Sequence, residues 1–258
     1  MQKKVMVLSL GGSLIIPDDV EISFLEKFKK TIKKNTGKYK FIIVCGGGSV
    51  ARKYIFALRT IGASEKLQSM AGISATRINA RFMTYVFGKD ANDGVPHDMK
   101  EVKNLLQKND VVFCGALRYE EKQTSDSTSA KLANFFKTDF INMTNVPGLY
   151  TKNPLEKTSR HPSDCTKRCR PSVLRGESTR EIKGFSRDAK FIPKISWKNF
   201  NRIVDKIKFE PGQHFVLDQT AAKIILKDKI KTYIIGKDLK QLDNILKGKK
   251  FVGTIIEG

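Results

Sequence analysis

Two glycine-rich turns near the N-terminus carry the residue types that bind phosphate. Gly11-Gly12-Ser13 directly follows an apolar run, and Gly46-Gly47-Gly48-Ser49 follows another and precedes Arg52. Glycines let backbone N–H groups approach an anion closely, while serine hydroxyls and the arginine fork add donors. Where such a turn opens a helix, the unpaired N–H groups and the helix dipole favour the same negative charge. A pair of glycines is also common in plain tight turns, so the second turn is the stronger phosphate-binding candidate.

Three further segments place polar side chains where helices begin or strands end. Gly72, Thr76 and Asn79 share one side of a predicted helix, which fits either a ligand contact or close helix packing. Thr124-Ser125-Asp126 begins another helix. It is either a cap whose aspartate complements the dipole or a phosphate grip in which Asp126 orients reacting groups. Residues 144–151 follow a predicted strand and offer contacts for a base and a ribose.

The second glycine turn also matches a spacing found in dinucleotide-binding proteins. Gly46, Gly48 and Ala51 have that spacing, and Glu65 follows about twenty residues later. In those proteins the spacing follows the first strand, whereas here another glycine turn precedes it. A Walker A sequence is absent from the chain. An oxidoreductase with a dinucleotide cofactor is therefore a minor alternative.

The elements expected to position these turns alternate along the chain. Short apolar runs predict buried strands at 5–10, 41–45, 111–114, 140–143, 232–235 and 251–256. Apolar residues at helical spacing predict helices at 22–34, 50–61, 73–87, 99–108, 128–136, 221–226 and 239–246. This alternation predicts an α/β protein with a largely parallel sheet and helices on both faces. Ligands in such sheets bind beyond the carboxyl ends of the strands, where the glycine turns lie.

The chain is strongly basic. Its 258 residues include 48 lysines and arginines against 26 aspartates and glutamates, a formal net charge of +22. At 40% hydrophobic residues it can bury a core, which excludes wholesale disorder. Such a charge attracts nucleic acid, but the chain has no zinc-finger spacing, no aromatic ribonucleoprotein signature and no basic helix joined to heptads. We therefore expect small polyanionic partners rather than nucleic acid.

One segment differs from the rest of the chain. Residues 158–188 hold six arginines and two lysines, whereas the other residues hold six arginines and 34 lysines. We expect an arginine-rich insertion, a surface loop, within a single domain of residues 1–258, although its composition leaves open that it was acquired separately. His161, Cys165 and Cys169 are only three possible metal ligands, and neighbouring prolines oppose the helix that would align them. We do not expect a metal site there.

Cysteine usage and hydropathy give the expected compartment. Cys45 and Cys114 each end an apolar run, which indicates buried thiols rather than a disulfide framework. The apolar N-terminal stretch is interrupted by glycines and lacks a cleavage site, so we do not expect a signal peptide. No run reaches the eighteen or more apolar residues of a membrane span. We expect a soluble, cytoplasmic protein without a membrane partner.

Taken together, these motifs resemble those of archaeal-type uridylate kinases, in the amino acid kinase superfamily. The resemblance rests on residues 46–52, 72–80, 124–126, 144–151 and 218–225, and it covers nearly everything except the arginine-rich segment. It implies a three-layer αβα sandwich that transfers the γ-phosphoryl group of ATP to UMP in pyrimidine nucleotide biosynthesis. It also implies Mg²⁺ as the cofactor that accompanies ATP, and a homo-oligomer, usually a hexamer.

The same resemblance implies a site for each nucleotide. ATP would be held by Gly12, Ser13, Gly48, Arg52, Asn145, Tyr150 and Asn153. UMP would be held by Gly47, Ser69, Gly115, Thr124, Ser125 and Asp126. Asp126 and Arg52 are the expected catalytic residues, and no side chain is expected to ligate a metal. A monophosphate is already largely ionised at neutral pH, so the reaction needs in-line placement and charge stabilisation rather than a general base. We therefore expect His97 and His214 to be structural or loop residues.

Several positions depart from the family pattern. Ser9 stands where superfamily members often carry a lysine, and Ser69 stands where an aspartate is expected to bind ribose. Pro147 and Asn153 replace two further aspartates, and residues 115–123 are longer than the usual loop. These departures leave open a non-catalytic nucleotide sensor on the same fold, or a kinase with another phosphate acceptor.

Overall fold

The computed structural model describes residues 3–121, 123–151, 189–205 and 216–258. Its contacts separate two compact units: one joins Met1–Leu149 to Pro193–Gly258, and the other is Tyr150–Ile192. The arginine-rich segment at 158–188 lies outside the described residues, and so does His214. Within the described parts, no helix is long and apolar enough to cross a membrane.

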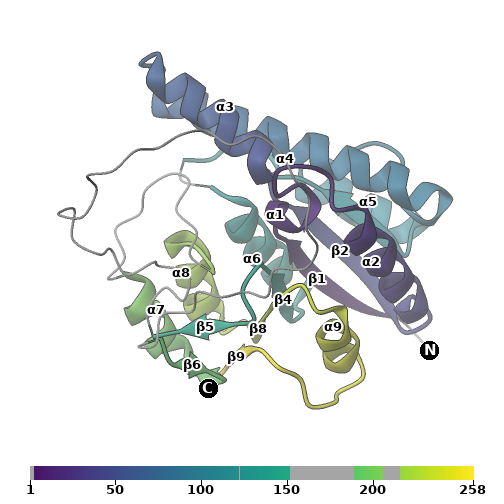
Figure 1. Cartoon of the computed structure of the whole chain (residues 1–258). Helices are drawn as coiled ribbons and strands as arrows, with labels where there is room; N and C mark the ends of the chain where they lie inside the picture. The colour runs from purple at the N-terminus through teal and green to yellow at the C-terminus, as the bar shows by residue number, and fades with distance from the viewer. Residues whose placement is uncertain (1–2, 122, 152–188, 206–215) are drawn as a thin grey trace, which may run out of the picture. The chain divides into compact units, whose positions relative to one another are not determined.

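Seven strands of the larger unit form one sheet in the order β3-β2-β1-β4-β8-β9-β7 (Figure 1). They are β1 (Lys4–Leu10), β2 (Tyr39–Cys45), β3 (Val111–Cys114), β4 (Phe140–Met143), β7 (Lys194–Ile195), β8 (Thr232–Ile235) and β9 (Thr254–Ile256). Every neighbouring pair is parallel except β8 and β9, which are antiparallel. The prediction of a largely parallel sheet is confirmed.

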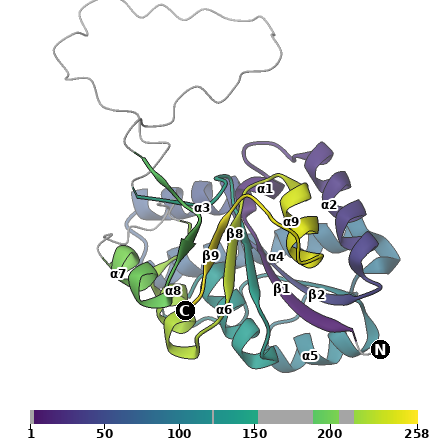
Figure 2. The same cartoon turned by 90° about the horizontal axis from the view of Figure 1, so that it is seen from below.

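Helices cover both faces of this sheet (Figure 2). They are α1 (Gly12–Ile15), α2 (Ile22–Asn35), α3 (Gly48–Thr60), α4 (Glu65–Phe87), α5 (Met99–Lys108), α6 (Ser125–Phe136), α7 (Trp197–Asp205), α8 (Gln219–Asp228) and α9 (Leu239–Leu246), with a 3₁₀ turn η1 at Gly88–Asp90. On one face, α2, α4 and α9 share a hydrophobic core with the strands. On the other, α6 packs on β1, β2 and β4, and α8 packs on α6. The three-layer αβα prediction is confirmed.

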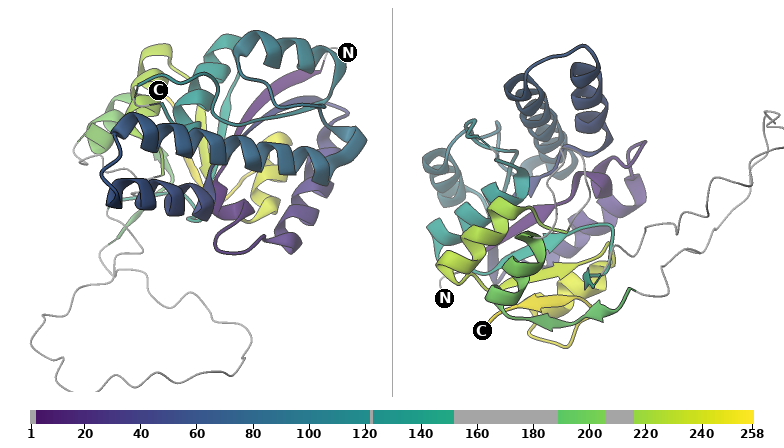
Figure 3. Two further views of the ribbon diagram at one scale, coloured as in Figure 1. Left: turned by 90° about the horizontal axis from the view of Figure 1, so that it is seen from above. Right: turned by 90° about the vertical axis from the view of Figure 1, so that its left-hand side faces the viewer.

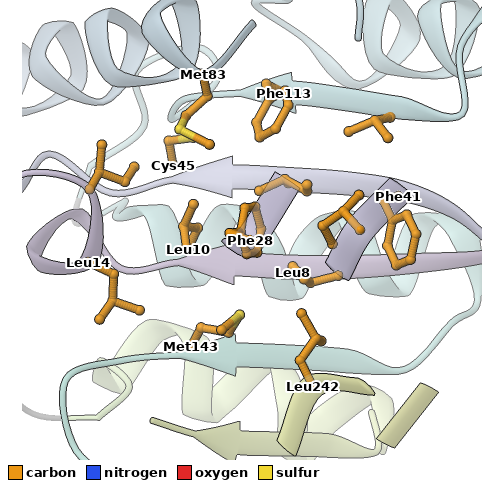
Figure 4. Close-up of a cluster of buried hydrophobic side chains, with 14 of the residues drawn as sticks. Leu8, Leu10, Leu14, Phe28, Phe41, Cys45, Met83, Phe113, Met143 and Leu242 are labelled. Carbon is orange, nitrogen blue, oxygen red and sulfur yellow. The ribbon is translucent and has the colours of Figure 1, made fainter. Parts of the chain in front are cut away.

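The strands divide their side chains between these two faces. Leu8 and Leu10 of β1 point into the core that holds Phe28 of α2 and Leu242 of α9 (Figure 4). Because successive side chains of a strand point to opposite faces, Ser9 lies on the other side, toward α6. This alternation decides which helix each strand residue can reach.

Cys45 and Cys114 are fully buried at the ends of their strands, as predicted. Burial raises the pKa of the Cys45 thiol well above its usual value, with the neighbouring Cys114 adding to the effect. Burial raises the pKa of Cys114 to about 12. Neither thiol is therefore primed as a nucleophile, since the thiolate is the reactive form.

Helices α4 and α7 differ most from the sequence predictions, while the short α1 was also not predicted and β9 begins at Thr254 rather than at residue 251. The helix predicted from residue 73 begins at Glu65, where the Ser64 side chain accepts from the backbone N–H of Leu67. Its first turns are exposed and pack along α3, so no core-facing periodicity marks them (Figure 3). Helix α7 was not predicted because only Phe200 and Val204 are buried along it, too few to define a stripe.

The smaller unit is described only at its two ends. There β5 (Leu149–Tyr150) pairs with β6 (Phe191–Ile192) in a two-stranded sheet. The rings of Tyr150 and Phe191 meet edge to face with centroids 5.4 Å apart, and the N–H of Thr151 donates to the carbonyl of Lys190. The ring contact and this hydrogen bond stabilise the pairing of the two short strands.

Candidate active site

The carboxyl ends of four neighbouring parallel strands bring the candidate segments together. Leu10, the last residue of β1, pairs with Cys45 of β2 on one side and Met143 of β4 on the other. Val44 of β2 pairs with Cys114, the last residue of β3. The turns that follow these strands therefore leave the sheet at one edge, which is where parallel sheets bind ligands.

The two glycine turns touch each other backbone to backbone. A Cβ atom on Gly12 would lie 2.0 Å from the backbone nitrogen of Gly48, and one on Gly46 would lie 2.5 Å from that of Gly12. Gly48 also has a φ of +62°, which L side chains rarely adopt. Glycine is required at these positions by the contact itself, so the turns form one continuous backbone surface at the start of α1 and α3.

Helix α4 holds the second glycine turn through a buried side chain. The Asn79 amide donates to the carbonyl of Gly46 at 2.7 Å. A Cβ on Gly47 would lie 2.4 Å from Cβ of Ala51 and 3.6 Å from the carbonyl oxygen of Gly72. The small and polar side of α4 thus serves both alternatives left open by the sequence: its small residues permit close packing, and Asn79 fixes the turn.

The same helix also fixes the turn after β3. Thr76 Oγ1 accepts from the N–H of Ala116 at 2.9 Å, and a Cβ on Gly115 would lie 2.7 Å from that oxygen. The Arg77 guanidinium donates to the carbonyls of Ala116 and Leu117 at 3.2 and 2.8 Å. Burial lowers the pKa of Arg77. The predicted UMP-side residue Gly115 is therefore anchored by Thr76 and Arg77, whose roles the sequence did not reveal.

Asp126 lies in the first turn of α6 and contacts β1. Thr124 caps this helix, with its side chain accepting from the N–H of Ser127 and the Ser127 hydroxyl accepting from the N–H of Thr124. Ser9 Oγ donates to Asp126 Oδ1 at 2.8 Å. Thr124-Ser125-Asp126 is thus a helix cap, and it also places a carboxyl group beside the strand that carries the first glycine turn.

A second carboxylate lies close to Asp126. Asp218 caps α8, accepting from the N–H of Ala221 at 2.9 Å, and it also accepts from the hydroxyl of Thr124. Burial, followed by the charge of Asp218, raises the pKa of Asp126 to about 7, while the Ser9 hydrogen bond acts in the opposite direction. Burial also raises the pKa of Asp218, against the donors that bind it. The two carboxyl groups therefore hold a proton more readily than exposed aspartates do.

Arg52 lies in the first turns of α3, next to the second glycine turn. Its Nη2 donates to the carbonyl of Pro17 at 3.2 Å, which ties the guanidinium to the connection between α1 and α2. A guanidinium has five N–H donors in a planar fork, so this bond leaves the group able to bind phosphate oxygens. The structure thus places Arg52 beside Gly48, as its predicted role requires.

The sequence also predicts nucleotide contacts at Ser69, Asn145, Tyr150 and Asn153. Asn145 is exposed after β4, where the Thr144 hydroxyl donates to its side-chain oxygen at 3.3 Å. Ser69 is exposed on α4. Tyr150 belongs to the smaller unit, and Asn153 lies outside the described residues, so neither is placed relative to the glycine turns.

A separate cavity of about 380 Å³ lies at the amino ends of β2 and β3, away from the glycine turns. Its lining includes Lys33, Lys40 and Asp90. Lys40 donates to the carbonyls that end α5, and Lys33 pairs with Asp90 at 2.7 Å. These lysines serve helix C-termini and an acidic neighbour, so the cavity does not compete with the glycine turns as a candidate site.

Comparison with known proteins agrees with this geometry. The model of the amino acid kinase family matches residues 4–163. The chain is 35% identical over 254 residues to a uridylate kinase of Archaeoglobus fulgidus, covering 97% of this chain and 99% of that protein. It is 30% identical to a uridylate kinase of Thermococcus onnurineus, covering 98% and 99%.

Solved structures extend the comparison to the fold. The crystal structure of uridylate kinase from Archaeoglobus fulgidus superposes with a TM-score of 0.74 at 34% identity, covering 98% of this chain and 99% of that one. The UMP kinase of Ureaplasma parvum, at 18% identity and full coverage of both chains, shares the fold with a TM-score of 0.71. With its sheet order, its paired glycine turns and this match along most of its length, the chain belongs to the amino acid kinase family.

Proposed function

We propose that this chain is a UMP kinase that transfers the γ-phosphoryl group of ATP to UMP. The observation that carries the proposal is the contact between the two glycine turns, which presents backbone N–H groups beside Arg52 at the carboxyl edge of the sheet. A uridylate kinase 35% identical over nearly the same length supports the choice of substrates.

The donor and acceptor sides are proposed from the family resemblance of the residues in each turn. Gly12, Ser13, Gly48 and Arg52 bind the ATP phosphates, with Asn145 near the nucleoside, while the roles of Tyr150 and Asn153 stay predictions of the family resemblance. UMP is bound by Gly47, Ser69, Gly115, Thr124, Ser125 and Asp126. Helix α4 anchors both Gly46 and Ala116, so one helix sets the spacing between the turns that are proposed to hold the two phosphates.

We propose Mg²⁺ as the ion that accompanies ATP. In sites of this kind Mg²⁺ keeps several waters and binds the substrate phosphates, so the proposal assigns it no ligand among the side chains of this chain. Among the described residues, no three histidine, cysteine, aspartate or glutamate side chains gather as a metal site. When bound, the ion would neutralise charge on the transferring phosphoryl group.

The chain's own residues then have two tasks. The glycine N–H groups and Arg52 hold the phosphates in line and stabilise the charge that develops during transfer. No base is needed, because the attacking UMP phosphate is already largely ionised at neutral pH. Asp126 acts as an orienting residue at the start of α6, fixed there by Ser9.

We also propose that the chain assembles as a homo-oligomer, with a hexamer as the form that the family resemblance implies. Seven large apolar side chains are exposed on α3, on α4 and at the end of α3: Tyr54, Phe56, Ile61, Leu67, Met70, Ile78 and Tyr85. Large exposed apolar patches mark interaction sites on soluble proteins, so this helix pair is the proposed contact between copies.

A coupled assay of ADP release across UMP, CMP, AMP and other phosphoryl acceptors tests the proposed activity. We expect turnover that depends on UMP and Mg²⁺. Arg52→Ala removes charge-assisted bonds worth about 1.5–3 kcal/mol, so kcat/KM should fall about 10- to 150-fold. Asp126→Asn should also lower the rate sharply, whereas the exposed neighbour Lys53→Ala should not. Binding of both nucleotides without UDP formation would instead indicate a nucleotide sensor.

A further inference from the structure

Ser9 is a buried polar residue immediately before the first glycine turn. Its side chain is 1% exposed, and it lies between Leu8 and Leu10, which point into the opposite hydrophobic core. Its hydroxyl donates to Asp126 Oδ1 at 2.8 Å. These two residues are 117 positions apart in the sequence, so the bond joins the end of β1 to the start of α6.

The residues around Asp126 make the Ser9 hydrogen bond important, because they include another carboxyl group and no basic partner among the described residues. The elements packed on α6 are β1, β2, β4 and α8. From α8 comes the carboxyl group of Asp218, which the Thr124 hydroxyl joins to the same helix start. From β1 comes Ser9, and from β4 the uncharged Asn142, which donates to the carbonyl of Val216. In the described part of the chain, no lysine, arginine or histidine contributes to the pKa of Asp126.

We propose that Ser9 is a positioning residue for phosphoryl transfer: its hydroxyl holds the Asp126 carboxylate against β1 and so fixes the start of α6 beside the first glycine turn. This inference rests on the proposed kinase function. With no cationic partner from the described residues, Asp126 is held in place by a neutral donor. A hydrogen bond to an ionised carboxylate is roughly twice as strong as one between neutral groups. Protonation of Asp126 therefore weakens the connection.

Asp126, Ser9 and Asp218 together predict how the activity depends on pH. Ionised Asp126 is the form that positions the site, so activity rises as the pH increases through the region near 7 in which this carboxyl group titrates. Ser9 favours the ionised form, and Asp218 opposes it. Removing the Ser9 hydroxyl should therefore move the acid limb to higher pH. Removing the Asp218 charge should move it to lower pH.

The kinetic test compares the dependence of kcat on pH in four proteins: wild type, Ser9→Ala, Ser9→Thr and Asp218→Asn. Loss of one hydrogen bond of about 0.5–1.5 kcal/mol corresponds to a rise of about 0.4–1 pH unit in the midpoint for Ser9→Ala. Ser9→Thr keeps the hydroxyl and should keep the wild-type midpoint. Asp218→Asn should lower it. The UMP phosphate also titrates near pH 6, but it is common to all four proteins and cancels in the comparison.

Carbon-13 NMR of aspartate-labelled protein provides a readout independent of catalysis. The Asp126 carboxyl resonance, assigned by its absence from Asp126→Asn, should titrate at higher pH in Ser9→Ala than in wild type. An unchanged or lower midpoint in Ser9→Ala, in either measurement, would overturn the proposal. If wild-type protein makes no UDP at any pH, the proposed function fails first. ATP affinity then decides whether Ser9 positions the turn, with a several-fold loss expected in Ser9→Ala but not in Ser9→Thr.

Discussion

The side-chain amide of Asn79 donates a buried hydrogen bond of 2.7 Å to the backbone carbonyl of Gly46. Gly46 follows β2 and Asn79 lies in the middle of α4, so this bond fixes the distance between the helix and the second glycine turn. Thr76 and Arg77, on neighbouring turns of α4, bind the segment after β3 in the same way. One helix therefore sets the positions of the second glycine turn, which is proposed to contact both nucleotides, and of the loop after β3, which is proposed to contact UMP.

Replacing Asn79 by alanine tests this role. The change leaves the Gly46 carbonyl buried without its donor, which costs about 1–3 kcal/mol of the free energy of unfolding. We expect urea denaturation to show that loss and ATP affinity to fall with it. Ser74→Ala is the matched control, because Ser74 makes only an exposed bond to the carbonyl of Met70 on the same helix. Equal stability and equal ATP affinity in Asn79→Ala and Ser74→Ala would contradict the assignment.

The contact between the glycine turns gives a second prediction. Gly12→Ala places a methyl group 2.0 Å from the backbone nitrogen of Gly48, so the turns must separate. Because the displaced atoms are backbone, we expect at least about a hundredfold loss of kcat/KM, as for a misplaced catalytic group. Gly37→Ala is the control, since nothing lies within 4 Å of its added carbon. Steady-state kinetics measure kcat/KM of both variants. A value near that of wild type in Gly12→Ala would refute the close contact between the glycine turns.

Elements whose pattern is local in the sequence were predicted, and elements defined by their packing partners were not. The bounds of α5, β3, β4, β8 and α9 agree with the sequence predictions because each element is short and carries its own periodicity. The two glycine turns were also predicted, since phosphate binding requires their residue types locally. The first turns of α4 were missed because they pack on α3 rather than on the sheet.

The supporting residues of the candidate site depend on contacts between distant positions. Asn79 is 33 residues from Gly46, Thr76 is 40 from Ala116, and Ser9 is 117 from Asp126. A single sequence gives each of these residues a polar type but not its partner. Ser9 in particular was identified as a departure from a lysine, and only its contact with Asp126 reveals what a hydroxyl can do there.

Asp126 should make stability depend on pH in an unusual direction. Its pKa in the folded protein is raised to about 7, above about 3.9 in the unfolded chain. The folded state therefore binds more protons between these values, so this group makes the free energy of unfolding fall as the pH rises through that window. Asp218 shifts in the same direction. The carboxylate that positions the site is thus held ionised at a cost to stability.

Urea denaturation at several pH values between about 4 and 8 measures this effect. Asp126→Asn keeps an oxygen that can accept from Ser9 but cannot titrate, so it should reduce the decline in stability toward neutral pH. Asp93→Asn, at an exposed carboxylate, should leave the decline as in wild type. If Asp126→Asn and wild type show parallel pH profiles, the carboxyl group is not the source.

The apolar face of α3 and α4 predicts the outcome of a charge substitution on assembly. Phe56 is 70% exposed and is one of six exposed large apolar side chains on α3 and α4. Burying one such side chain in a contact between copies is worth about 1.5–3 kcal/mol, and a carboxylate there would have to be desolvated without a partner. Phe56→Glu should therefore convert the wild-type oligomer to a smaller species in sedimentation velocity, whereas Val252→Glu, 58% exposed but away from these helices, should not. A wild-type monomer, or equal sedimentation of wild type and Phe56→Glu, would remove this face from consideration as the assembly contact.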